Sequence, residues 1–295
     1  MLRIFPEGIN INFLGIRKFC YFLSLALAIA GVVSIITHKG LRYGVEFTGG
    51  KIITCGFRKK VNIEEIRKIF ADKGYRDVSI QEIAGENKFL IRGKKETPIS
   101  ELIQEELKDK EPEIEMVKTI GPMISAELRK RAFWMVFFGI IVMLIYISIR
   151  FNFRFGVASI LALVHDVIIT IGLLSILNKE ITPAIMAAIL TIIGYSINDS
   201  IVLSDRVREN LRFVRKKPIF DIINMSINQV LNRTVITSLT TLFVLITLLI
   251  FGGYVIRDFA LTLTIGVIVG TYSSIFIVAP IVYEWERLSP SLTRK

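Results

Sequence analysis

The chain has 295 residues, of which 52% are hydrophobic and 21% are charged, and its mean hydropathy is +0.56. A water-soluble protein of this length is usually less apolar, because much of its surface must face water. The net charge of +11 would suit a nucleic-acid-binding protein, but the basic residues form no stripe interleaved with aromatic side chains. Composition therefore excludes nucleic acid as a partner and favours a membrane protein.

The charges are not spread evenly. Residues 39–131 hold 20 of the 37 basic and 16 of the 26 acidic residues, which is typical of a mixed-charge domain that faces water. The two cysteines, Cys20 and Cys55, lie in an apolar stretch and in this charged segment. Their spacing fits neither a disulfide nor a metal site, so we expect both to be inert and expect no metal and no cofactor.

Six stretches are apolar over about the 20 residues that a helix needs to cross a bilayer. They are Phe19–Thr37, Phe133–Ile149, Phe155–Leu177, Pro183–Leu203, Val235–Phe251 and Phe259–Tyr283. The first is long for a signal peptide and lacks an A-x-A cleavage pattern, so we expect it to be a retained helix.

Basic residues predict the orientation of these spans, since loops rich in Lys and Arg stay in the cytoplasm. The loops between spans two and three, and between spans four and five, are basic, as are the residues before the first span and after the last. The alternate short loops hold only Lys179 and Arg257. This pattern predicts cytoplasmic termini and three regions: 1–38 with the first span, an extracytoplasmic domain at 39–131, and the remaining five spans at 132–295.

The domain at 39–131 contains four stretches typical of strands, at 51–57, 77–83, 88–92 and 113–120. Asn62 is positioned to cap a helix that runs to Asp72 and is ended by Gly74. Thr97 and Pro98 predict a second helix with a capping side chain and Pro in its first position. The order of strand and helix, βαββαβ, is that of a ferredoxin-like α+β sandwich. The fold class expected is six transmembrane helices with this domain inserted between the first two.

One segment looks like a phosphate-binding loop. From Gly44 to Lys51 the sequence reads GVEFTGGK, which is one residue longer than the phosphate-loop spacing. Ile52 also stands where a Ser or Thr would hold magnesium. We interpret the segment as structural, and because no other catalytic motif is present we expect the protein not to be an enzyme.

Charged residues inside the predicted spans need a reason, because each costs about 2.5–3.5 kcal/mol to insert. Asp166 lies near the middle of the third span, about 16 Å from its start at the helical rise. His165 is its neighbour, and Thr170 follows one turn later on the same face. Asp199 lies deep in the fourth span.

The fifth helix is expected to begin at Asn232 and Arg233, which would place Arg233 at a depth similar to that of Asp199. Polar residues continue at helical spacing along both spans. They are Thr191, Tyr195, Asn198, Asp199 and Arg206 in the fourth, and Arg233, Thr237, Thr240, Thr241 and Thr247 in the fifth. Two interpretations stay open: a route for protons or ions, or ion pairs that only hold helices together. Gly266 and Gly270 in the last span, followed by Ser273 and Ser274, predict close helix packing.

Several short motifs occur together along the chain. They are Gly44-Val-Glu46-Phe47-Thr48-Gly49-Gly50, Thr119-Ile-Gly121-Pro122, Leu163-Val-His165-Asp166, Gly194-Tyr-Ser196-Ile-Asn198-Asp199-Ser200, Asp205-Arg206, Asn232-Arg233-Thr234 and Arg257-Asp258. Together they resemble the SecF family, the smaller partner of SecD in prokaryotic protein export, over almost the whole chain. Glu46 stands where that family usually has Asp, so the carboxylate is kept.

The resemblance implies one six-helix half of an RND-type transporter in the prokaryotic cytoplasmic (inner) membrane, surrounded by lipid. It implies a SecD-like six-helix partner, association with the SecYEG channel and small Sec accessory subunits, and contact with unfolded exported protein. The driving force would be the proton or sodium gradient. In the family, polar residues of helices 4 and 5 belong to the ion path, which carries over to Asp199 and Arg233, with Asn198 and Ser196 as neighbours. Asp166 and His165 would be further relay groups.

Two alternatives remain at this point. One is an RND-like exporter of small molecules or lipids, although a charged 93-residue insert leaves little room for an apolar substrate pocket. The other is a passive scaffold that holds a translocation complex together, in which neutralising Asp199 would leave export intact.

Overall fold

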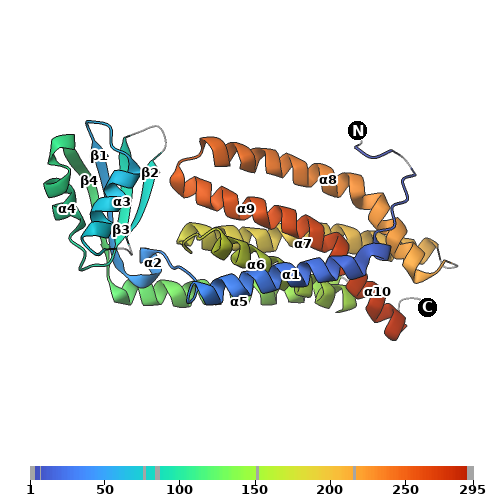
Figure 1. Ribbon diagram of the computed structural model, residues 1–295. Coiled ribbons are helices and arrows are strands. Elements are labelled where there is room, and N and C mark those ends of the chain that lie inside the picture. Colours follow the sequence, from blue (N-terminus) through green and yellow to red (C-terminus); the bar gives the residue numbers. More distant parts are fainter. Residues whose placement is uncertain are drawn as a thin grey trace.

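The computed structural model describes residues 4–6, 8–75, 78–83, 87–150, 153–214 and 217–290, and of residues 254 and 255 only the backbone. It shows a bundle of long helices with a small α+β domain at one end (Figure 1). The two ends of the chain lie toward the other end of the bundle (Figure 1).

The α+β domain has the predicted order of elements. Its strands β1 (Gly50–Phe57), β2 (Ser79–Ile83), β3 (Lys88–Gly93) and β4 (Pro112–Ile120) form one antiparallel sheet in the order β2-β3-β1-β4. Helices α3 (Ile63–Asp72) and α4 (Ile99–Glu106), with a 3-10 turn η2 (Lys108–Lys110), complete it. The ferredoxin-like prediction is confirmed. Asp77, predicted to start the second strand, lies outside the described residues, as do Gly85 and Glu86 of the turn that Gly85-Glu86-Asn87 predicts between the second and third strands.

The ends of the two helices test the capping predictions. The Asn62 side chain accepts a hydrogen bond from the Glu64 amide at 3.0 Å, and Gly74 adopts a left-handed φ of 87° beyond the other end of α3, as predicted. The prediction for α4 is wrong in detail: Pro98 is the N-cap residue, and no side chain caps the helix. Thr97 is instead buried in the turn before the helix, where its own amide donates to the Lys94 carbonyl.

The core of the domain lies between the sheet and its two helices. Cys55, Phe89 and Ile91 from the strands and Ile66 from α3 are completely buried there. Burial raises the pKa of the Cys55 thiol from its ordinary value of 9.0 to about 11, so the thiolate is scarce at neutral pH. Cys55 and Cys20 are both buried free thiols, as expected.

Six helical stretches of the described chain are long and apolar enough to cross a membrane. They belong to α1 (Arg17–Thr37, preceded by the 3-10 turn η1, Leu14–Ile16), α5 (Pro122–Arg150), α6 (Phe153–Ile176), α7 (Pro183–Phe213), α8 (Ile219–Phe251), and α9 (Tyr254–Ser273) with its continuation. A single π-helical turn, η3 (Ser274–Val278), joins α9 to α10 (Ala279–Leu288). Each predicted span lies in one of these stretches, apart from Leu177 at the end of the third, so the predicted membrane fold is confirmed.

Several helices extend beyond their apolar stretch. The expectation that the fifth helix begins at Asn232 and Arg233 is wrong, because α8 already begins at Ile219. Its first four turns bury Ile223, Ile227 and their neighbours against the bundle, while polar residues occupy the other face. A search for a continuous apolar run does not register such an amphipathic extension. In the same way α5 starts at Pro122 and passes through position 131 without a break.

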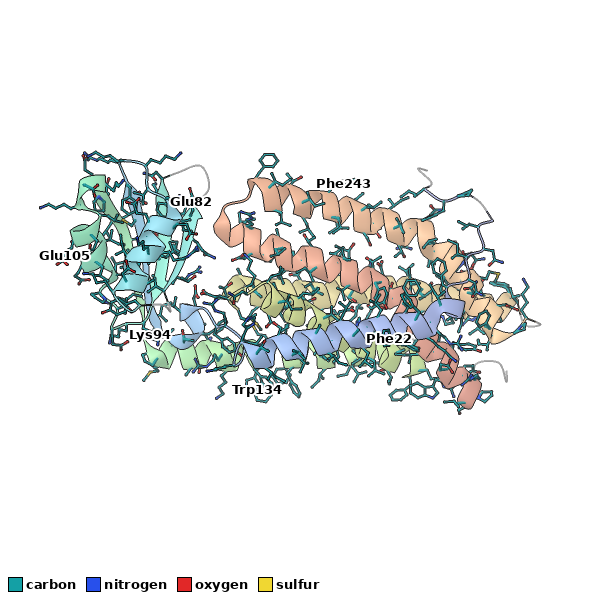
Figure 2. The ribbon with its side chains drawn as sticks, viewed as in Figure 1. Phe22, Glu82, Lys94, Glu105, Trp134 and Phe243 are labelled. Carbon is teal, nitrogen blue, oxygen red and sulfur yellow. The ribbon has the colours of Figure 1, made fainter. Side chains whose placement is uncertain are left out.

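The α+β domain and the helix bundle have different outer surfaces, as is expected for a membrane protein. Figure 2 shows the charged side chains of Glu82, Lys94 and Glu105 on the α+β domain, and all three are exposed. The aromatic side chains of Phe22 and Phe243 point away from the bundle and are 69% and 66% exposed, which suits a surrounding of lipid or partner helices (Figure 2).

The domain is tied to the bundle at the loop between α6 and α7. The Gly44 amide donates to the Ile181 carbonyl at 2.9 Å, and the Ile181 amide donates to the Arg42 carbonyl at 2.7 Å. From β3, the buried Arg92 forms an ion pair of 3.6 Å with Glu180 of the same loop. The position of the domain is therefore linked to that of α7.

The glycine-rich segment that resembles a phosphate loop completes this connection. It forms a single helical turn, α2 (Val45–Thr48), which buries Phe47 among residues of α5, α6 and α7. Gly50 has a φ of 152°, and a Cβ there would lie 2.4 Å from the Gly93 carbonyl oxygen. Only glycine allows this close approach, which supports the structural interpretation of the segment.

Candidate functional site

Among the described residues of the helix bundle, two buried carboxyl groups form no ion pair with Lys or Arg, whereas the buried Asp258 and Glu286 pair with Lys179 and Arg154. Asp166 on α6 is fully buried, and Asp199 on α7 is 5% exposed. A buried carboxylate requires compensation from neighbouring groups, so their surroundings define the candidate site.

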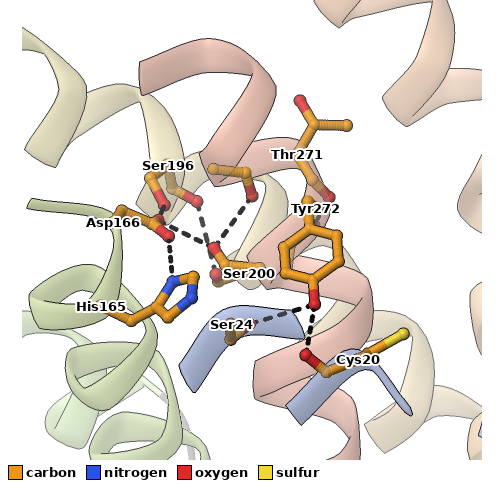
Figure 3. Close-up of polar contacts among 11 residues, drawn as sticks. Cys20, Ser24, His165, Asp166, Ser196, Ser200, Thr271 and Tyr272 are labelled. Carbon is orange, nitrogen blue, oxygen red and sulfur yellow. Dashed lines mark hydrogen bonds and ion pairs between the residues drawn. The ribbon is translucent and has the colours of Figure 1, made fainter. Parts of the chain in front are cut away.

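Asp166 is held by side chains from two other helices and from its own (Figure 3). Its Oδ2 accepts hydrogen bonds from Ser196 Oγ of α7 at 2.5 Å and from Ser273 Oγ of α9 at 2.8 Å. Its Oδ1 lies 3.0 Å from Nδ1 of His165. The sequence predicted Asp166, Ser196 and His165 as candidate residues, and the structure brings the three together.

The approach of α9 to α7 makes this arrangement possible. A Cβ on Gly266 would lie 2.2 Å from the Ile192 side chain, and one on Gly270 would lie 3.0 Å from Cβ of Ser196. The predicted close packing by these glycines is confirmed. Ser273, one turn after Gly270, thereby reaches Asp166, and the π-helical turn η3 follows directly after it.

His165 connects the cluster to α1. Its ring stacks on Tyr272 with centroids 6.3 Å apart, and the Tyr272 hydroxyl donates to the Cys20 carbonyl at 2.8 Å and lies 3.0 Å from Ser24 Oγ (Figure 3). Nε2 of His165 is buried and finds no hydrogen-bond partner among the residues that the structure describes. Thr170 is also buried, but its hydroxyl has no partner, so it does not contribute a hydrogen bond to Asp166.

Asp199 has a different environment. Its Oδ2 is buried without a hydrogen-bond partner, and among the described residues no ion pair reaches its carboxyl group. Arg233 of α8 is near enough for its charge to act on Asp199, although the two side chains are not in contact as an ion pair. A carboxyl group held by no donor can gain or lose a proton without breaking a bond within the protein.

The contacts between α7 and α8 place these two residues at the same level. The Tyr195 hydroxyl of α7 donates to the Thr237 carbonyl at 3.4 Å and to Thr241 Oγ1 at 3.3 Å on α8. The helices are antiparallel, since Arg206, further along α7, bonds to Gln229, earlier in α8. Asp199 lies one turn from Tyr195, and Arg233 lies one turn from Thr237, both toward the end of the helices where Arg206 meets Gln229. This register supports the similar depth expected from the sequence.

Among the described residues, the remaining predicted residues form no hydrogen bond or ion pair with either carboxyl group. Asn198 is exposed, and Arg233 lines a cavity of about 1170 Å³ between α8 and the N-terminal residues. Asp205 and Arg206 form ion pairs within α7, to Arg208 and Glu209 respectively. The motif residues Gly44, Glu46, Phe47, Thr48, Gly49, Gly50, Gly121, Pro122, Arg257 and Asp258 lie where the domain meets the bundle or at the adjoining helix ends.

At that boundary, Asp258 at the start of α9 forms an ion pair of 2.7 Å with Lys179. The Phe47 carbonyl accepts a hydrogen bond from Arg129 of α5. Within the part of the chain that the structure describes, no group of three or more His, Cys, Asp or Glu side chains is arranged to hold a metal ion.

Sequence reasoning missed two members of the Asp166 cluster. Ser273 was interpreted only as a packing residue, and Tyr272 was not singled out. The signal for Ser273 was its spacing after Gly266 and Gly270, which places a hydroxyl on the same close-packed face of the helix. A hydroxyl on a tightly packed face needs an acceptor in the neighbouring helix.

Comparison with known proteins agrees with the geometry. The family described as "Protein export membrane protein SecD/SecF, C-terminal" matches residues 100–288. A protein translocase subunit SecF of Calditerrivibrio nitroreducens is 42% identical over 293 residues, which cover 96% of each chain. The chain belongs to the SecF family.

Relatives also include a fused protein. The protein translocase subunit SecDF of Thermus thermophilus is 41% identical over 93% of this chain, which corresponds to 38% of the fused protein. A crystal structure described as SecDF, a translocon-associated membrane protein, from the same organism matches 96% of this chain with a TM-score of 0.84 and 40% identity. The SecF-family chain spans 40% of that solved chain.

The Asp166 cluster generates a prediction with a matched control. Ser273→Ala removes a donor from a fully buried carboxylate and should lower the free energy of unfolding by about 1–3 kcal/mol. Ser274→Ala removes only a hydrogen bond to the Thr271 carbonyl of its own helix and should cost less than about 1 kcal/mol. Thermal unfolding of the purified variants in detergent measures the difference, and equal losses would contradict the assigned role of Ser273.

Proposed function

We propose that this SecF-family chain is one half of a SecD–SecF complex that uses the proton or sodium gradient to assist Sec-dependent protein export. The observation that carries the proposal is Asp199, a membrane-buried carboxyl group without a hydrogen-bond donor, at the level of Arg233 on the adjacent helix. In a family of export proteins, such a pair is a candidate for the group that senses the gradient.

The partnership with SecD is supported by the fused relative, whose name joins both halves in one chain. It is also supported by the surface of α8, where Phe243, Val244 and Phe251 are 61–81% exposed. A second six-helix chain would cover part of this face. We extend the proposal to the SecYEG channel, small Sec accessory subunits and unfolded exported protein as further partners, with membrane lipid around the remaining faces.

The proposed mechanism begins with the charge on Asp199. When its carboxyl group is ionised it attracts the Arg233 guanidinium, and when it is protonated that attraction is lost. Arg233 is exposed to a cavity, so its side chain has room to move. A single proton therefore biases the balance between two arrangements of α7 and α8. The membrane potential supplies about 2.3 kcal/mol per charge for each 100 mV.

Movement of α7 would reach the α+β domain directly. At its far end, α7 follows the loop in which Glu180 pairs with Arg92 and Ile181 bonds to the segment before α2. Lys179 of this loop also pairs with Asp258 of α9. A shift of α7 relative to α9 would therefore be transmitted to the domain through this loop.

The orientation in the membrane is part of the proposal: both termini in the cytoplasm of a bacterial cell and the α+β domain outside the inner membrane. Cysteine labelling in intact cells measures it, because the buried Cys20 and the Cys55 thiol with its raised pKa give little background. An impermeant thiol reagent should label Lys95→Cys but not Arg212→Cys, and the reverse pattern would contradict the orientation.

The gradient-sensing role predicts the effect of neutralising Asp199. Asp199→Asn keeps the shape of the side chain but cannot ionise, so gradient-dependent stimulation of export should be abolished while the complex still assembles. Arg233→Lys should also impair stimulation, because an ammonium group does not reproduce the planar guanidinium. Translocation into vesicles at a controlled gradient, normalised to assembled complex, provides the measurement.

The matched control is Asp205→Asn, which neutralises an exposed carboxylate on the same helix and should retain the gradient response. A full response in Asp199→Asn would remove this residue from the mechanism. Loss of assembly without loss of coupling per complex would favour the passive scaffold.

A further inference from the structure

A row of asparagines on α8 holds the N-terminal part of the chain. We call residues 4–6 and 8–13 the strap, and Asn224, Asn228 and Asn232 the ladder. The ladder residues are four positions apart, so they lie on one face of α8. In Figure 1 the strap runs beside α8 before the chain enters η1 and α1.

Each ladder side chain binds the main chain of the strap. Asn232 accepts from the Phe5 amide at 2.9 Å and donates to the Phe5 carbonyl at 3.1 Å. Asn228 makes the same two bonds to Ile11, both at 2.9 Å. Asn224 accepts from the Phe13 amide at 2.9 Å and donates to the Ile11 carbonyl, also at 2.9 Å. Apart from a 3.5 Å hydrogen bond from Asn224 to the Asn10 side chain, the ladder bonds to main-chain N–H and C=O groups of the strap, as the edge strand of a sheet does.

The strap and α8 enclose the cavity of about 1170 Å³ that Arg233 lines. Polar and charged residues make up ten of the sixteen that line it, among them Asn10 and Asn12 from the strap, the ladder, Gln229 and Lys217. Thr237 also lines it, and Thr237 is the residue whose carbonyl accepts from Tyr195 of α7. The cavity therefore extends from the strap to the helix contact beside Asp199. A polar cavity of this size has room for many water molecules.

We propose that the strap and the ladder form the wall of an aqueous vestibule through which water and the coupling ion reach Arg233 from the cytoplasmic end of the bundle. The importance of Arg233 rests on the proposed function, whereas the vestibule itself rests on the hydrogen bonds and the cavity. The ladder residues act as positioning residues, because they touch the strap and not the ion.

Hydrogen exchange in the full-length protein tests separately how each ladder residue holds the strap. The Phe5 and Ile11 amides should exchange more slowly than in an unstructured peptide. Asn228→Ala should accelerate exchange at Ile11 by about fivefold or more while Phe5 stays protected, and Asn232→Ala should do the converse. Each variant is the control for the other, and a variant that simply misfolds would release both. If both amides of the unaltered protein exchanged as fast as in an unstructured peptide, the proposed binding of the strap by the ladder would be overturned.

Thiol labelling in inverted vesicles tests the vestibule. A cysteine at Thr237 should react with an impermeant reagent from the cytoplasmic side, whereas one at Ser238, which is buried and bonded to Thr271, should not. Asn224→Ala combined with Asn228→Ala should raise the rate at position 237 several-fold. Equal rates at 237 and 238 would overturn the vestibule, and a rate unaffected by the ladder variants would overturn the strap as its wall.

These readouts are independent of export. If Asp199→Asn retained its gradient response while position 237 still reacted from the cytoplasmic side, the proposed function would fail and the vestibule would stand. If position 237 did not react while Asp199→Asn lost its response, the vestibule would fail and the proposed function would stand.

Discussion

A carboxyl group buried among membrane helices has to be compensated by the protein, and Asp166 and Asp199 are treated in opposite ways. Asp166 receives hydroxyl donors from α7 and α9 and lies against His165, so its bonds hold three helices in one arrangement. Within the described residues Asp199 receives no donor, and Arg233 acts on it through its charge without forming an ion pair. The first environment suits a fixed anchor and the second suits a group that changes its protonation state.

Other parts of the structure maintain the different environments of Asp166 and Asp199. Glycines on α9 permit the close approach that brings Ser273 to Asp166, and Tyr195 fixes the register of α7 against α8. The same helix α7 begins beside the loop that carries Glu180, which is paired with the α+β domain. An event at Asp199 and the position of the domain are therefore connected through one continuous helix, with the Asp166 cluster providing a fixed point between them.

Sequence patterns predicted the parts of the fold that depend on local chemistry. The Asn62 cap, the four strands and the six spans follow from side-chain type and periodicity, which act over a few residues. The start of α8 was missed because its first turns are amphipathic and their burial depends on packing against distant helices. The wrong prediction of a cap at Thr97 has a similar cause, since the turn before α4 buries that side chain.

The residues of the candidate site were also only partly predictable from the sequence. Asp166 and His165 were recognisable because ionisable groups in an apolar span are rare. Ser196 was named from the family resemblance, and Ser273 required knowledge of which helix faces which. The ladder left a visible signal, three asparagines at a spacing of four, but its meaning depends on a strap more than 200 residues away. Periodicity shows that a polar face exists and does not show what covers it.

We propose that Asp199, rather than Asp166, is the carboxyl group that exchanges protons. Infrared difference spectra of the purified protein in lipid, recorded between two pH values, report a titrating carboxyl group through the C=O band of its protonated form. The account predicts that this band disappears in Asp199→Asn and persists in Asp166→Asn. A band that persists in Asp199→Asn and is lost in Asp166→Asn would contradict it.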